Sequence, residues 1–226
     1  MSFDLTCSQP RPFRKRLACA AVFSALMSGC AQTVNVEADF PEPLVETLPL
    51  TVGLKYDEAL SGYQYKEQVP NDVEWTFNLG AANLKLFDTV FGSLFSEAVP
   101  VADIATAAEQ YPELDAVIAP EVEALEFSLP RQSQSDQYSV WIRYNLNVFD
   151  PSGDLITIWP VSAYGQSDTR VFGASGAMEQ ATIRAMRDAA ASITLGFDQQ
   201  PKIKDALLDD GRDESEQSES EPVADD

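Results

Sequence analysis

Closely spaced carboxylates are the side chains of this sequence that could bind a metal or cleave a glycosidic bond. Glu121, Glu123 and Glu126 follow one another at short spacing, and Asp209 and Asp210 are adjacent. Ca²⁺ sites use carboxylate oxygens, and glycoside hydrolases use a pair of carboxyl groups. No Asp-x-Asp-x-Asp-Gly loop occurs, and a chain with 36 Asp and Glu residues brings some carboxylates together by chance. We therefore predict no metal site and interpret these residues as a solvated strand edge.

Other familiar catalytic sets do not occur in the sequence. It contains no histidine, which excludes Ser-His-Asp triads, Cys-His dyads and imidazole metal ligands. The glycines of Gly173-Ala-Ser-Gly176 are not followed by lysine, so we interpret this segment as a helix start capped by Ser175. No Ser-x-x-Lys sequence is present either. We predict that the protein is not an enzyme and has no cofactor.

The charge balance limits the class of partner. There are 15 Lys and Arg residues against 36 Asp and Glu residues, a formal net charge of −21. A polyanion of this kind is repelled by DNA, RNA and anionic membrane surfaces, so no nucleic-acid partner is expected. The hydrophobic fraction of 45% is ordinary for a folded protein, which argues against disorder of the whole chain.

The most regular pattern in the chain predicts a long β-hairpin. Apolar and polar residues alternate over 138–149, Pro, Ser and Gly in 150–154 favour a turn, and 155–164 returns. Pro160 has no amide hydrogen, so the returning strand should be bulged or lie at a sheet edge there.

One face of this hairpin is our candidate partner-binding site. For a turn of this length, the residue numbers of each pair across the hairpin sum to about 305. This places Trp141 opposite Tyr164 and Arg143 opposite Ser162, while Trp159 lies on the core face. If helices cover only the core face, Trp141, Arg143 and Tyr164 are exposed, and exposed aromatics beside Arg suit protein or glycan contact.

Two alternatives remain open for this face. The segments 31–47 or 63–77 could cover it, or a one-residue bulge could exchange the two faces of the returning strand.

The remaining elements place the hairpin in one domain. We predict strands over 48–56, 63–69, 73–77 and 116–129, the last interrupted at Pro120, and helices over about 81–98 and 174–195. The last helix carries a stripe of small residues that allows close approach to a sheet: Ala174, Ala177, Ala181, Ala185 and Ala189. This order predicts an α+β two-layer sandwich, with a mixed or antiparallel sheet and two helices on one face.

The first thirty residues have the pattern of a targeting signal. Arg11, Arg14, Lys15 and Arg16 precede an apolar run over 17–28, too short to span a bilayer as a mature helix. The sequence Leu26-Met-Ser-Gly-Cys30 resembles the lipobox of bacterial lipoproteins. The alternatives are a plain secretory signal and a single anchor helix.

The lipobox resemblance implies a location and a modification. Cleavage would precede Cys30, and Cys30 would carry a thioether-linked diacylglycerol and an N-acyl chain such as palmitate. Ala31 and Gln32 follow where Asp would retain a lipoprotein in the inner membrane, so the resemblance implies the outer membrane, facing the periplasm. Cys7 and Cys19 lie in the removed part, which leaves no disulfide.

We therefore divide the chain into four parts. Residues 1–29 are the expected lipoprotein signal peptide, 30–47 a lipidated tether, 48–208 a single periplasmic α+β domain and 209–226 a disordered acidic tail. The extended tether would reach at most about 55–60 Å.

The element order, the long hairpin and the Ala-rich last helix resemble a known small α/β domain. It occurs in the N-terminal part of the Tol–Pal translocation protein, in curli-secretion lipoproteins and in lipoprotein activators of peptidoglycan synthases. The resemblance carries over no catalytic residue. It implies a non-enzymatic adaptor or assembly factor of the cell envelope, with an envelope protein or peptidoglycan as partner. The alternative is a ligand-binding lipoprotein that carries a glycan or lipid fragment.

Overall fold

The computed structural model describes residues 31–133 and 135–209. The predicted signal peptide, Cys30 and all of the predicted acidic tail except Asp209 lie outside the described residues. The strands are β1 (Gln32–Asn35), β2 (Leu48–Leu54), β3 (Gln64–Gln68), β4 (Glu74–Asn78), β5 (Phe95–Pro100), β6 (Ala116–Ser128), β7 (Gln137–Phe149) and β8 (Leu155–Asp168). The helices are α2 (Glu58–Ser61), α3 (Gly80–Leu94), α4 (Ala107–Gln110), α5 (Pro130–Ser133), α6 (Thr169–Gly196) and α7 (Pro201–Ile203), with a π-helical turn over Lys204–Leu208.

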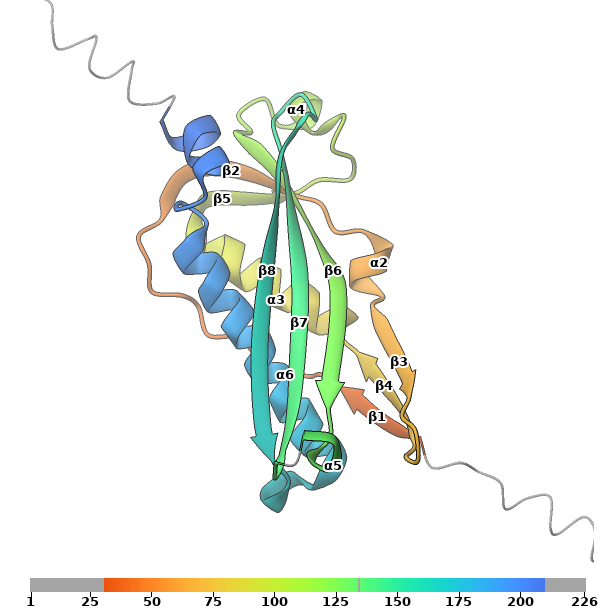
Figure 1. Ribbon diagram of the computed structural model, residues 1–226. Helices are drawn as coiled ribbons and strands as arrows, with labels where there is room; N and C mark the ends of the chain where they lie inside the picture. The colour runs from red at the N-terminus through yellow and green to blue at the C-terminus, as the bar shows by residue number, and fades with distance from the viewer. Residues whose placement is uncertain (1–30, 134, 210–226) are drawn as a thin grey trace, which may run out of the picture.

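The strands form two sheets. Five strands are ordered β5-β2-β6-β7-β8, and three are ordered β1-β4-β3. In the larger sheet β2 is parallel to β5 and β6, whereas β6, β7 and β8 are antiparallel, so the sheet is mixed. Figure 1 shows α3 and α6 behind β6, β7 and β8, on one side of these strands. The predicted α+β two-layer class is confirmed, and the structure adds the second, smaller sheet.

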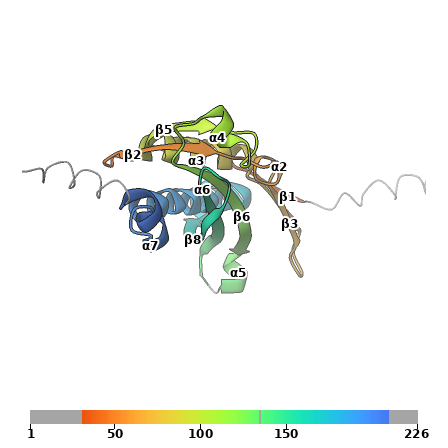
Figure 2. The same cartoon turned by 90° about the horizontal axis from the view of Figure 1, so that it is seen from above.

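The larger sheet is strongly curved around its helices. Seen from above, β6 and β8 lie on one side of α6 and β2 lies on the other (Figure 2). The surface of β6, β7 and β8 that faces away from the helices is called the outer face below. None of the helices among the described residues is long and apolar enough to cross a membrane.

The predicted hairpin register is confirmed. Trp141 pairs with Tyr164, Arg143 with Ser162, Asn145 with Pro160, Leu146 with Trp159 and Ile142 with Ala163. Gly153 adopts a positive φ of 90° in the turn, a conformation that glycine tolerates. β8 is the last strand of the sheet, and the Tyr164 amide points to its open edge. Pro160 lies four residues earlier and faces the same edge, so its missing amide hydrogen breaks no pairing.

Close packing of α6 on β8 explains the stripe of small residues. Ala177, Ala181, Ala185 and Ala189 are fully buried. A Cβ atom added to Gly165 would lie 2.0 Å from the Ala181 carbonyl oxygen and 2.4 Å from the Ala185 nitrogen. The helix backbone therefore lies directly on the strand at Gly165, a contact that no larger residue permits.

Side chains of α6 also bind the open edge of β8. Asp188 Oδ2 accepts a hydrogen bond from the Tyr164 amide at 2.9 Å, and Arg184 donates to the Gln166 carbonyl. These bonds satisfy backbone groups that an edge strand otherwise leaves unpaired.

A polar pair is buried in the core. The Tyr144 hydroxyl donates to Asn83 Oδ1 at 2.9 Å, and both side chains are fully buried. Burial raises the pKa of Tyr144 far above its ordinary value, so its hydroxyl stays protonated and remains a donor.

The tether prediction is wrong over its first part. β1 pairs in parallel with β4, and Val34, Val36 and Phe40 are buried. The segment 32–40 therefore belongs to the domain rather than to the tether expected over 30–47. Its apolar positions are too few to predict a strand, and their packing partners lie far along the chain.

The end of one helix also differs from the prediction. The helix expected over about 81–98 ends at Leu94, because the backbone of Phe95 is extended and begins β5. The apolar spacing continues into Phe95 because its ring packs on Phe197, with centroids 5.0 Å apart.

Pro120 does not interrupt its strand, contrary to the prediction. The amide of Lys55, the residue after β2, donates to the Ile118 oxygen, so the backbone polar groups of Ile118 point toward β2. Alternate residues of a strand point these groups to the same side, so those of Pro120 also point toward the β2 side. β2 has already ended at this level, and Pro120 loses no strand pairing there. The irregularity lies instead between Val122 and Ala124.

Candidate binding site

The outer face presents three successive cross-strand rows of side chains. The first row is Glu126, Trp141 and Tyr164; the second is Ala124, Arg143 and Ser162; the third is Glu121, Asn145 and Pro160. Because side chains alternate between the two faces of a strand, these residues all point away from α3 and α6. The three residues predicted as a binding site, Trp141, Arg143 and Tyr164, therefore lie together on one surface.

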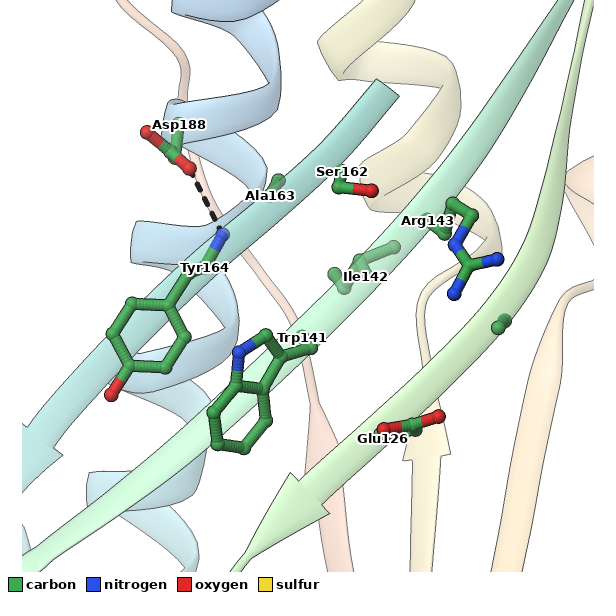
Figure 3. A pocket seen from close by; sticks show the side chains of 9 residues that line it. Glu126, Trp141, Ile142, Arg143, Ser162, Ala163, Tyr164 and Asp188 are labelled. Atoms are coloured by element: carbon green, nitrogen blue, oxygen red, sulfur yellow. Dashed lines mark hydrogen bonds between the residues drawn. The ribbon is translucent and has the colours of Figure 1, made fainter. Parts of the chain in front are cut away.

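Trp141 and Tyr164 form an exposed aromatic pair. Their ring centroids are 4.9 Å apart with a 40° angle between the planes, and the residues are 44% and 40% exposed. The Tyr164 hydroxyl lies 3.1 Å from Ser139 Oγ and donates to Gln166 Oε1 at 3.0 Å. Figure 3 shows the two rings side by side, projecting from neighbouring strands. The hydrogen bonds fix the tyrosine ring, so the pair is a preformed apolar surface.

Polar side chains continue along the same face from the aromatic pair. Arg143 Nη1 lies 3.3 Å from Glu123 Oε1, and Asn145 Nδ2 donates to Glu121 Oε1 at 3.2 Å. Both members of the Arg143–Glu123 pair are nearly half exposed, so the pair contributes little to stability and its side chains can reorient.

Glu123 reaches Arg143 because of the irregularity in β6. The register with β7 shifts between Val122 and Ala124, which leaves Glu123 as an extra residue without a partner in β7. A bulge of this kind re-aims side chains at a functional surface. The sequence spacing alone did not reveal this position.

An open cavity of about 310 Å³ lies over the first two rows. It is lined by Ala124, Glu126, Trp141, Ile142, Arg143, Ser162, Ala163, Tyr164 and Asp188 (Figure 3). This volume is at the lower end for small-ligand sites, and the mixture of apolar surface with a few polar groups is typical of them. Asp188 was missed at the sequence level because it reaches the cavity from α6, through its bond to the Tyr164 amide.

The carboxylates considered first lie apart from any metal-type cluster. Glu121, Glu123 and Glu126 are exposed on β6, and Asp209 is exposed at the end of the described residues. Over residues 31–133 and 135–209, no group of three carboxylate or thiol side chains is arranged to hold a metal ion. Asp210 and the predicted lipidation site Cys30 lie outside this part of the chain.

Comparisons with known proteins yield only weak similarities of fold. No family model and no curated protein matches the chain. A Xanthomonas campestris protein of the DUF330 family is 10% identical, with a TM-score of 0.46 over 82% of this chain and 98% of the other. A Helicobacter pylori protein, provisionally described as a homologue of a neuraminyllactose-binding hemagglutinin, is 13% identical, with a TM-score of 0.42 over 79% and 100%.

A Caulobacter crescentus protein provisionally described as a lipoprotein is 15% identical, with a TM-score of 0.30 over 40% of this chain and 70% of the other. At such identities and TM-scores, similarity does not transfer a function to this chain.

Proposed function

We propose that the protein is a lipid-anchored lipoprotein of the outer membrane, facing the periplasm, that acts as a non-enzymatic adaptor or assembly factor. It binds a protein partner through the outer face of β6, β7 and β8. The observation that carries this proposal is the fixed, exposed pair of Trp141 and Tyr164 at the centre of a polar surface.

The outer face has the composition of a protein-binding surface. Interfaces concentrate their binding energy in a few central aromatic and arginine residues, surrounded by a polar rim that excludes water. Trp141, Tyr164 and Arg143 are residues of this kind, and Glu121, Glu123 and Asn145 supply polar neighbours. At about 3.3 Å per residue, the 13 residues of β7 also make a platform about 43 Å long.

The proposal includes no catalytic step. Ser162 lines the cavity with Glu126 and Asp188, but Asp188 already accepts a hydrogen bond from a backbone amide, and the chain contains no histidine to activate a hydroxyl. Binding is therefore the activity that these residues support.

The proposed anchor would hold the domain close to the membrane. β1 begins at Gln32, two residues after Cys30, and two residues span at most about 7 Å. A lipid on Cys30 would therefore attach almost directly to the fold. An adaptor held in this way binds partners that lie near the membrane surface.

We expect Trp141→Ala to weaken partner binding by about 2 kcal/mol or more, roughly 30-fold, with little change in stability. The reason is that the Trp141 ring is exposed and packs on another exposed ring. The measurement is recovery of the partner from solubilised membranes by the immobilised full chain, alongside urea denaturation of the same variant.

Trp159→Ala is the matched control. Trp159 is half-buried beside Phe197, with ring centroids 6.3 Å apart, on the opposite face of the same hairpin. Its loss should lower stability by about 2–3 kcal/mol and leave binding unchanged. If Trp141→Ala unfolds the domain, or binds the partner as the unmodified chain does, the proposed surface is wrong.

A further inference from the structure

The cavity over the aromatic pair has an excess of negative charge. Glu126 and Asp188 line it, and Glu121 and Glu123 lie on the same face. Arg143 is the one basic residue of the lining, and it is paired with Glu123 at 3.3 Å. Together with the chain's net charge of −21, this arrangement repels anionic ligands and attracts cationic ones.

The exposed ring faces of the pair are open to a cation. Aromatic faces attract an ammonium or guanidinium group within about 6 Å, Trp most strongly. The rings of Trp141 and Tyr164 pack on each other, and Arg143, the basic residue of the lining, pairs with Glu123. Both rings remain more than a third exposed. A cation entering the cavity would therefore meet aromatic faces and carboxylates at once.

We infer that this cavity receives a Lys or Arg side chain from a basic segment of the protein partner; this rests on the proposed function. The apolar stem of such a side chain packs along the rings while its charged end reaches Glu126 or Asp188. A volume of about 310 Å³ accommodates one long side chain with its neighbouring backbone. A neutral glycan could also stack on the rings, but it would leave the carboxylates without a counter-charge.

The test uses the full chain in a non-ionic detergent and calorimetric titration with short peptides at about 150 mM salt. The probe is a capped peptide with alternating Lys and Arg residues, and its matched control carries norleucine and citrulline in their place. We expect the basic peptide to bind at least about fivefold more tightly than the neutral one.

Three variants separate the cavity from general attraction to an acidic protein. Trp141→Leu and Glu126→Gln should each weaken binding of the basic peptide about 5- to 30-fold. Glu97→Gln makes the same charge change at an exposed position of β5, the opposite edge of the sheet, and should change binding less than about twofold. Equal losses in Glu97→Gln and Glu126→Gln would overturn the inference.

A chitin oligosaccharide supplies the competing outcome. If it binds the full chain and loses affinity in Trp141→Leu, while the basic peptide does not, the cavity takes a neutral glycan and the inference is wrong. If the peptide does not bind but Trp141→Ala still loses the protein partner, the inference fails while the proposed function stands.

Discussion

Replacing Gly165 with valine is expected to unfold the domain. A Cβ atom at this position would lie 2.0 Å from the Ala181 oxygen and 2.4 Å from the Ala185 nitrogen, and these are backbone atoms that cannot rotate away. Relief requires α6 to lift from β8, which exposes its buried stripe to water. We expect a loss of more than about 4 kcal/mol, a large fraction of the stability of an ordinary domain. Urea denaturation followed by circular dichroism measures it.

Gly92→Ala is the control for this substitution. Gly92 lies in the interior of α3, is exposed, and a Cβ atom there would meet nothing within 4 Å. Alanine favours a helix interior over glycine by about 1 kcal/mol, so this variant should be slightly more stable. A Gly165→Val protein that unfolds at the same urea concentration as the unmodified chain would show that α6 does not rest on β8 at this point.

Replacing Cys30 with serine is expected to abolish acylation and membrane attachment through lipid. The lipobox resemblance assigns several acyl chains to this one residue, and one chain alone anchors a protein only marginally. Metabolic labelling with palmitate should therefore disappear in Cys30→Ser, and the signal should remain uncleaved or the protein be released.

Cys7→Ser and Cys19→Ser are the matched controls. Both residues precede the predicted cleavage site, so their loss should leave labelling and fractionation with the outer membrane unchanged. Palmitate labelling that persists in Cys30→Ser would refute the lipobox.

The hairpin could be predicted to the individual residue pair because its signals are local. Alternation over 138–149 indicates which side chains share a face, and the short turn sets the register, so Trp141 was expected opposite Tyr164, with a one-residue bulge as the alternative that the structure does not show at these pairs. The alanine stripe of α6 was equally clear, since its spacing depends on one helix alone. Where neighbouring residues determine the geometry, the sequence was sufficient.

The rest depended on contacts between distant segments. β1 has four residues, and its partner β4 lies about forty residues away, so nothing near Val34 marks it as buried. Glu126 joins the site through the register of β6 on β7, which a bulge at Glu123 alters, and Asp188 joins from a helix. Local patterns thus identified the aromatic centre of the site but not its acidic border.

Site-specific photo-crosslinking in living cells shows whether the outer face binds a protein. A photoreactive amino acid replaces Ser162, which is exposed in the lining of the cavity, and in a parallel strain it replaces Glu97 on the opposite edge of the sheet. We expect position 162 to form a crosslink to one defined protein, identified by mass spectrometry. Trp141→Ala should remove this crosslink, and position 97 should form none. A crosslink of equal yield from both positions, or no protein crosslink from position 162, would contradict a protein-binding role for the outer face.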